Sequence, residues 1–220
     1  MNGRFARFDM DGTLFNYEAA MKKSLLEVTP GEMHDWIGNC SDIHSFGDHG
    51  DWASNLIDLI RRDPGWWRNL PKLQAGWDVY EVAKDIGFCC HILTKGPSSK
   101  PTAWAEKVEC IHKHFGEGMS IDIVGDPDSK GNMYGRVLVE DYPHYLQGWL
   151  DNRPRGLGVL IDHPYNASFE HENVVRYRGD NIEEVKKALQ AAYNRKSKQH
   201  WKELLWDNGR EARCLSWDKQ

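Results

Sequence analysis

Short apolar runs alternate along the chain with segments in which apolar residues recur every three or four positions. The short runs have the length of β-strands and occupy residues 3–9, 88–93, 121–124, 137–139, 157–161 and 174–177. Helical periodicity fills residues 18–28, 32–37, 52–60, 77–86, 102–115 and 181–193. Strands that alternate with helices predict an α/β fold in which helices flank a parallel sheet.

The stretch between the first two predicted strands is much longer than an ordinary connection and is mostly helical in pattern. An insertion of this length suits a small helical cap, which closes over the mouth of a site and excludes water. We therefore expect an α/β core in residues 1–15 and 86–193, a cap with its return helix in residues 16–85, and a tryptophan-rich tail in residues 194–220.

The tail carries three tryptophans, Trp201, Trp206 and Trp217. Together with Leu204 and Leu205, Trp201 would form a short amphipathic face. We expect this face to dock on the body of the protein or on another subunit, as in a homodimer.

Length and charge narrow the classes of protein that fit. A chain of 220 residues suits one large domain or a core domain with a modest insertion. The net charge of -5 argues against a general nucleic-acid binder, which usually carries a basic face. No apolar run approaches the length of a membrane span, and residues 1–14 lack the uncharged stretch of a secretory signal. We expect a cytoplasmic protein whose partner is neither a membrane nor an extended nucleic acid.

The five cysteines are Cys40, Cys89, Cys90, Cys110 and Cys214, and none of them forms a C-x-x-C pair. Cys89 and Cys90 lie inside a predicted apolar strand, where cysteine behaves as a small hydrophobic residue. This pattern favours reduced thiols in the core over disulfides or a zinc site.

The first predicted strand leads directly into the string DMDGTL at residues 9–14. Strand alternation would place Asp9 and Asp11 on the same side, although the turn at Gly12 and Thr13 can direct the second carboxylate separately. Such a pair suits a phosphate-ester hydrolase in which Asp9 attacks phosphorus and Asp11 acts as general acid and then base. The alternatives are a plain acidic turn or a fragment of a calcium loop.

Two later loops offer groups that bind phosphate. The second predicted strand ends at Thr94, whose hydroxyl, with Lys95 and Gly96 of the following loop, can bind phosphoryl oxygens. Lys130 lies in the polar loop after the third strand and would place a fixed positive charge beside the phosphoryl group. Threonine is common in strands and a loop lysine is usually solvated, so the order of these motifs along the chain carries the prediction.

The fourth predicted strand ends in adjacent acids, Glu140 and Asp141. Burying two carboxylates at a strand end is costly unless a cation binds them. Mg²⁺ requires few protein oxygens and retains several waters. We expect Asp9, the backbone carbonyl of Asp11, and one or both of these acids to hold Mg²⁺, with Asp141 as the direct ligand and Glu140 bound directly or through water.

The predicted cap contains Trp66 and Trp67, which follow a Pro-Gly turn, and Trp36 in an earlier short helix. In one interpretation these rings form flat walls for a ring-bearing substrate such as a nucleobase. In the other they only hold a small cap together, which suits Trp36 better than the Trp66–Trp67 pair.

Taken in order, these motifs closely resemble those of the haloacid dehalogenase (HAD) superfamily of phosphohydrolases. Within it, the sequence is most similar to the 5'(3')-deoxyribonucleotidase group. Three strings carry the narrower resemblance: WWRNLP at 66–71, ILTKGP at 92–97 followed by Trp104 and Lys107, and HPYN at 163–166. The group usually has paired aspartates in place of Glu140-Asp141 and valine in place of Thr13, which weakens the substrate assignment but not the phosphatase chemistry.

The resemblance implies a Rossmann-like core with a cap after the first strand. It also implies that Asp9 is the nucleophile, that Asp11 is the acid/base, and that Glu140 and Asp141 are the metal acids, with Thr94 and Lys130 as phosphate ligands. The expected activity is that of a Mg²⁺-dependent phosphomonoesterase acting on small deoxynucleoside monophosphates through an aspartyl-phosphate. A phosphatase of nucleic-acid 3' ends or of another small phosphoester is the alternative, and a non-catalytic nucleotide-binding module is a third.

Overall fold

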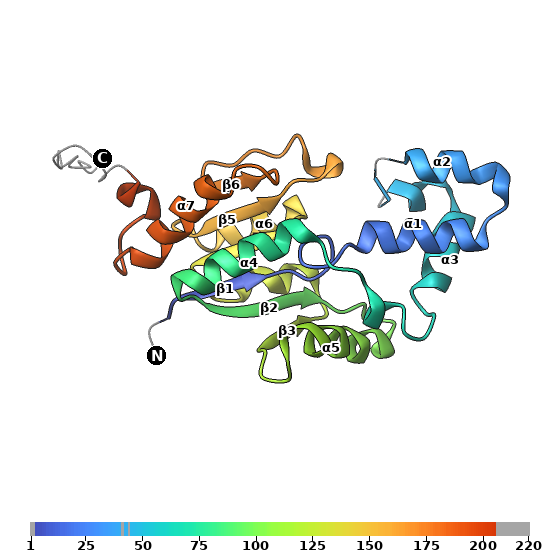
Figure 1. Cartoon of the computed structure of the whole chain (residues 1–220), viewed down its shortest axis with the longest axis horizontal. Coiled ribbons are helices and arrows are strands. Elements are labelled where there is room, and N and C mark those ends of the chain that lie inside the picture. Colours follow the sequence, from blue (N-terminus) through green and yellow to red (C-terminus); the bar gives the residue numbers. More distant parts are fainter. Residues whose placement is uncertain (1–2, 41, 44, 206–220) are drawn as a thin grey trace.

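A computed structural model describes residues 3–40, 42–43 and 45–205 of the chain. Its centre is a sheet of six strands that all run parallel, in the order β3-β2-β1-β4-β5-β6 (Figure 1). The strands are β1 (Phe5–Phe8), β2 (Cys89–Lys95), β3 (Ile121–Val124), β4 (Val137–Glu140), β5 (Leu157–Ile161) and β6 (Val174–Tyr177). The parallel sheet predicted from the alternation of apolar runs is therefore confirmed.

Helices cover both faces of the sheet and build a separate cap. The α-helices are α1 (Tyr17–Val28), α2 (His34–Asn39), α3 (Asp51–Ile60), α4 (Gln74–Ile86), α5 (Pro101–Phe115), α6 (Pro143–Asp151) and α7 (Ile182–Asn194). Short 3-10 turns are η1 (Gly31–Met33), η2 (Ser45–His49), η3 (Trp67–Asn69), η4 (Pro127–Asn132), η5 (Pro164–Asn166) and η6 (Trp201–Leu204).

Alternate residues of the strands enter two separate cores, as the two-residue period of a strand requires. Val137 and Val139 of β4 pack into the larger core, which also receives side chains of α4, α5 and α7. Leu138, between them, packs into a smaller core with Leu146 and Trp149 of α6. The central strands are consequently apolar on both sides, which explains why they appear in the sequence as continuous apolar runs.

The cap consists of α1, α2 and α3 and lies beyond the carboxyl ends of the strands (Figure 1). The chain leaves the core after Phe15 and returns through Pro71 to Leu73. These outgoing and returning segments run side by side, because Asn16 donates its N–H to the Pro71 carbonyl at 2.7 Å and Leu73 donates to the Leu14 carbonyl at 3.0 Å. The two crossings form a hydrogen-bonded hinge between cap and core.

Helix α6 is the one α-helix that the periodicity did not predict. It begins with Pro143 at its first turn, a position that proline tolerates because the N–H there has no helical partner. Its apolar contacts come from Leu146, Trp149 and Leu150. Three buried apolar positions in nine residues give only a short periodic signal, so packing against β4 and β5 stabilises this helix.

The structure changes the expectation for the two adjacent cysteines and accounts for a charged residue in β1. Cys89, expected in the core, is exposed at the first position of β2, and Cys90 is only partly buried, because the amino end of this strand is open to solvent. Arg7 is an unusual residue for the central strand β1. It forms a salt bridge with Asp122 of β3, which lies beyond β2 in the sheet. This ion pair allows the arginine side chain to be accommodated in a central strand.

The tail is described only as far as residue 205. In it, η6 packs against α7, and Trp201 is buried with its ring N–H donated to the Gly156 carbonyl at 3.2 Å. Trp206, Trp217 and Cys214 lie outside the described residues.

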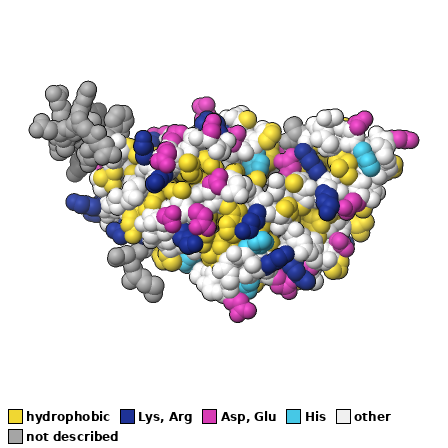
Figure 2. All heavy atoms as spheres, viewed as in Figure 1, with side chains coloured by type: hydrophobic (Ala, Val, Ile, Leu, Met, Phe, Trp, Pro, Cys, Tyr) yellow, Lys and Arg dark blue, Asp and Glu magenta, His cyan; other side chains and the backbone are white. Residues whose placement is uncertain are grey.

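The surface in view in Figure 2 carries acidic and basic side chains interspersed with apolar ones. In the described part of the chain, no helix combines the length and the apolar character that crossing a bilayer requires.

Candidate active site

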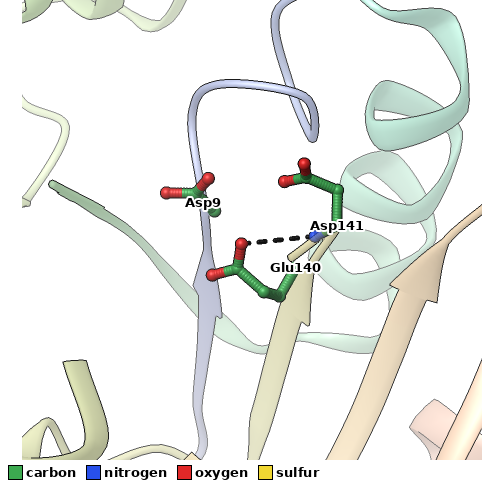
Figure 3. A group of neighbouring side chains, drawn as sticks. All are labelled: Asp9, Glu140 and Asp141. Atoms are coloured by element: carbon green, nitrogen blue, oxygen red, sulfur yellow. Dashed lines mark hydrogen bonds between the residues drawn. The ribbon is translucent and has the colours of Figure 1, made fainter. Parts of the chain in front are cut away.

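The acidic residues predicted to form the site meet at the centre of the sheet. Asp9 follows β1 directly, and Glu140 and Asp141 lie at the end of β4, the strand that pairs with β1 (Figure 3). From β1 the chain order proceeds outward to β2 and β3 on one side and to β4, β5 and β6 on the other. The acids therefore lie at the switch point of the topology, where open α/β sheets place their ligand sites.

The three acids form a compact group. One carboxylate oxygen from each of Asp9, Glu140 and Asp141 lies within 4.8 Å of the others, and all three residues are buried. Lys130 reaches two of them, with its Nζ 2.6 Å from Asp9 Oδ1 and 2.9 Å from Glu140 Oε2. One ammonium against three buried carboxylates leaves an excess of negative charge that a divalent cation would neutralise.

The pKa values of the buried acids are shifted mainly by burial and further by the neighbouring carboxylates. Burial raises the pKa of Asp9 to about 6, with Asp141 and Asp11 adding to the rise and Lys130 opposing it. Burial likewise raises the pKa of Glu140 well above its ordinary value. Burial alone would lower the pKa of Lys130, but the carboxylates of Asp9 and Glu140 raise it above its ordinary value. The lysine therefore remains charged. The three carboxylates offer hard oxygen ligands, the type that Mg²⁺ takes in proteins.

Asp141 is held by hydrogen bonds from three directions. Thr13 donates its hydroxyl to Oδ1 at 2.9 Å, Tyr165 donates to Oδ2, and the Asn166 side-chain amide donates to the Asp141 carbonyl at 2.8 Å. Gly12 is required here because a Cβ at this position would lie 2.2 Å from Asp141 Oδ2, and its φ of 75° also favours glycine. The turn after Asp11 and the late HPYN string thus converge on the same carboxylate.

Asp11 lies apart from the acidic group and is paired with a different lysine. Lys107 of α5 donates to Asp11 Oδ2, to Thr94 Oγ1 at 3.0 Å and to the Lys95 carbonyl at 2.7 Å. The predicted phosphate ligand Thr94 is fully buried beneath this contact. The structure therefore separates the two aspartates of the motif, one beside Lys130 and one beside Lys107.

A cavity of about 280 Å³ opens in front of these groups. Its lining includes the acids and Lys130 from the core, Tyr17 and Arg61 from the cap side, and Trp67 from η3. Further lining residues are Lys95, Pro97, Tyr142 and Tyr145. The cavity combines charged groups on the core side with aromatic and cationic groups on the cap side, as a site for a polar ligand with an apolar ring would.

The three cap tryptophans fall in different places. Trp67 lines the cavity, whereas Trp66 donates its ring N–H to Ser24 Oγ at 3.0 Å and borders a separate hollow on the cap. Trp36 lies against Phe46 and His49, with ring centroids 5.1 and 4.7 Å away. Of the Trp66–Trp67 pair singled out in the sequence, only Trp67 is brought to the acids.

The two residues after Thr94 that were expected to bind phosphate have different surroundings. Lys95 lines the cavity. Gly96 donates its backbone N–H to the Val124 carbonyl at 2.9 Å, so that donor is already in use. A Cβ on Gly96 would meet the Trp104 ring at 2.2 Å, which shows that this glycine allows Trp104 to cover the loop.

Sequence reasoning did not assign a role to Lys107, Arg61 or Tyr17. Lys107 is one of the residues that carry the resemblance to the nucleotidase group. A lysine on a helix is usually solvated, however, so no pattern in the sequence assigned it a role. Arg61 follows the last residue of α3 and donates its Nε to the Tyr17 hydroxyl at 2.7 Å. No spacing in the sequence relates the cap residues to the strand ends, so only the folded structure reveals them.

Mg²⁺ is expected to raise the melting temperature of the protein, and this gain should shrink as the pH falls below about 6. The pKa of Asp9, raised from 3.8 to about 6 by burial, means that a proton increasingly competes with the cation in that range. With one competing proton, the apparent affinity should weaken roughly tenfold for each pH unit below about 6. Thermal unfolding in excess MgCl₂ and in EDTA, compared at about pH 7.5 and about pH 5, measures it. An equal gain at both pH values would contradict the assignment of Asp9 as a ligand.

No protein-family model and no curated protein matches this sequence. Solved structures with a similar fold do exist. A haloacid dehalogenase-like hydrolase from Burkholderia xenovorans LB400 has a TM-score of 0.51 at 13% identity, and the match covers 83% of this chain and 96% of that chain. A HAD family hydrolase from Deinococcus radiodurans R1, with bound phosphate and sodium, has a TM-score of 0.51 at 12% identity and covers 87% and 97%.

The strand order and the acids at the switch point define an open α/β protein of the doubly wound class. Within that class, this chain has the fold of the HAD-superfamily hydrolases, with a parallel six-stranded sheet flanked by helices and a cap after the first strand.

Proposed function

We propose that this protein is a Mg²⁺-dependent phosphomonoesterase that cleaves small deoxynucleoside monophosphates through an aspartyl-phosphate. One observation carries the proposal: Asp9, Glu140 and Asp141 converge from two adjacent strand ends, with Lys130 between two of them, at the floor of a cavity. The phosphate and sodium bound to the Deinococcus hydrolase of the same fold add support for a site that takes an anion and a cation.

Asp9 is the nucleophile in this proposal. Lys130 holds its Oδ1, and among the described residues no hydrogen bond reaches its Oδ2, which leaves that oxygen to attack phosphorus. Attack forms the O–P bond of the aspartyl-phosphate and breaks the bond to the leaving alkoxide. The charge of Lys130 also offsets the negative charge that gathers on the phosphoryl oxygens.

Asp11 moves the protons. It protonates the leaving oxygen in the first step and takes a proton from the attacking water in the second, so that water hydrolyses the aspartyl-phosphate and Asp9 is regenerated. Asp9, Glu140 and Asp141, with the Asp11 carbonyl, would hold Mg²⁺. The cation would supply positive charge to the phosphoryl oxygens.

The aromatic side chains around the cavity support a substrate that bears a ring. Trp67 and Tyr17 lie with ring centroids 5.8 Å apart, and Tyr145 lies under Lys130, whose Nζ is 4.6 Å from the ring centroid. Aromatic side chains of this kind pack against a planar base. A volume of about 280 Å³ suits a small ligand better than a polynucleotide.

The test is phosphate release with Mg²⁺ from a panel of nucleoside 5'- and 3'-phosphates, a 3'-phosphorylated oligonucleotide, a sugar phosphate and p-nitrophenyl phosphate. The proposal expects deoxynucleoside monophosphates to give the highest kcat/KM. Preference for the oligonucleotide or the sugar phosphate would retain the phosphatase and replace the substrate. No release from any ester would overturn the proposal.

Arg61→Ala is expected to raise KM for a nucleoside monophosphate about tenfold or more while kcat changes little. Arg61 lines the cavity from the cap, and one of its five N–H groups is used on Tyr17. Because it would bind the part of the substrate that does not react, its loss affects ground state and transition state alike. Steady-state kinetics measure the change.

Arg62→Ala is the matched control, because the neighbouring Arg62 is exposed and borders the separate hollow on the cap. It should leave KM unchanged. If both variants shift KM equally, general charge attraction rather than Arg61 binds the substrate.

A further inference from the structure

We infer that Lys107 is the positioning residue of the general acid: through its bond to Oδ2 it fixes the orientation in which the Asp11 carboxylate exchanges a proton with the leaving oxygen. The inference rests on the proposed function. Lys107 lies in the second turn of α5, 96 residues from Asp11 in the sequence, and it is fully buried.

The ammonium of Lys107 has no donor left for a substrate. Lysine has three N–H groups, and the three acceptors are Asp11 Oδ2, Thr94 Oγ1 at 3.0 Å and the Lys95 carbonyl at 2.7 Å. The ring of Trp67 adds a further contact, with its centroid 4.7 Å from Nζ. Direct binding of the phosphoryl group by Lys107 would require breaking one of these bonds, so its partner in catalysis is Asp11.

The two oxygens of Asp11 are in different situations. Oδ2 is bonded to Lys107, whereas Oδ1 is buried and has no hydrogen-bond partner among the described residues. A buried carboxylate oxygen without a partner is rare, because it loses water and gains nothing in return. The Asp11 side chain is 25% exposed and lines the cavity, so the part that it presents there is not the buried Oδ1. The orientation of the carboxylate toward the cavity therefore depends on the bond from Lys107 to Oδ2.

The two lysines of the site therefore have separate tasks. Lys130 bonds to Asp9 and Glu140, on the side of the nucleophile and the metal acids. Lys107 bonds to Asp11 and to none of those three acids in the described structure. A fixed Asp11 is aligned for proton transfer before the substrate arrives, which lowers the barrier for esters that need an acid.

The leaving group provides a test that does not depend on pH. An alkoxide needs a proton as it leaves, whereas p-nitrophenolate leaves readily without one. A general acid increases the rate by a factor of about 10²–10⁴. Lys107→Met should therefore lower kcat/KM for a nucleoside 5'-phosphate by roughly 10²-fold. For p-nitrophenyl phosphate the same variant should lower kcat/KM by no more than about threefold, since phosphoryl transfer to Asp9 needs no acid there.

Two further variants separate positioning from a structural role. Asp11→Asn should show the same dependence on the leaving group, and adding Lys107→Met to it should cause little further loss, because the lysine acts through Asp11. Lys107→Gln retains an N–H donor and should restore part of the lost rate for the nucleotide. It also serves as the second variant if Lys107→Met does not fold, which thermal unfolding would show.

Equal losses for both esters, or additive losses in the double variant, would overturn the role of Lys107 while leaving the phosphatase in place. If the wild-type protein hydrolyses neither ester, the proposed function fails and the inference fails with it.

Discussion

Replacing Asp9 by asparagine is expected to abolish phosphate release, with a loss on the order of 10⁴-fold or more in kcat. An amide cannot form the acyl phosphate, and the variant also lacks one of the three carboxylates that would hold Mg²⁺. Single-turnover assays with the preferred ester measure the loss. They also show whether the wild-type chain incorporates phosphate, as an aspartyl-phosphate requires.

The folded state should tolerate this change. Asp9 is mostly ionised at neutral pH, but because burial raises its pKa to about 6, holding that charge costs folding free energy, and a neutral amide removes the cost. The melting temperature in EDTA is therefore expected to stay level or rise, which separates lost chemistry from lost structure. Asp85→Asn, at an exposed position of α4, is the matched control and should retain full activity. Turnover by Asp9→Asn near the wild-type rate would remove Asp9 as the nucleophile.

Lys130→Met is expected to reduce the free energy of unfolding by roughly 3–5 kcal/mol in the absence of metal. Lys130 is the buried cation bonded to both Asp9 and Glu140, so its removal leaves two buried carboxylates without that partner. The deficit should shrink as the pH is lowered, because protonation removes the charge from the two acids. Urea unfolding at several pH values measures both effects.

Lys23→Met is the control for losing one lysine, since Lys23 is exposed and its nearest acid, Glu27, is 3.9 Å away. That change should cost within about 0.5 kcal/mol. Were Lys130→Met to be as harmless as Lys23→Met, the three acids would not carry the charge excess that makes them a metal site.

Most elements of the fold could be predicted from local sequence patterns. β3, β5 and β6 have the predicted bounds, β4 is one residue longer, and α7 is shifted by one residue at each end, because each combines a strong periodicity with clear turn residues on both sides. α4 begins at Gln74, three residues earlier than the predicted start at Trp77, since Gln74 to Gly76 carry no apolar period of their own. α6 escaped prediction for a related reason, because contacts with neighbouring strands stabilise it more than its own pattern suggests.

The candidate site could be predicted where a polar or acidic residue lies at the carboxyl end of a strand. Asp9, Thr94, Glu140 and Asp141 stand at the carboxyl ends of three strands, and a parallel sheet brings such ends to one edge. Lys107 could not be assigned in this way, because its side chain reaches Asp11 across 96 residues and only the packing of α5 determines that contact. Trp66 and Trp67 could not be distinguished in the sequence. Their rings are nearly perpendicular, at 89°, and Trp67 lines the cavity whereas Trp66 bonds to Ser24 in the cap.

The sequence by itself determined that this protein is an α/β chain whose buried strands end in acids, because hydrophobic periodicity and the cost of burying a charge act locally. Only the tertiary structure decided which lysine meets which carboxylate, which cap side chains reach the cavity and which oxygen of Asp11 is left without a partner. Those contacts join residues far apart in the chain, and their geometry depends on how helices and cap pack against the sheet, which no local pattern encodes.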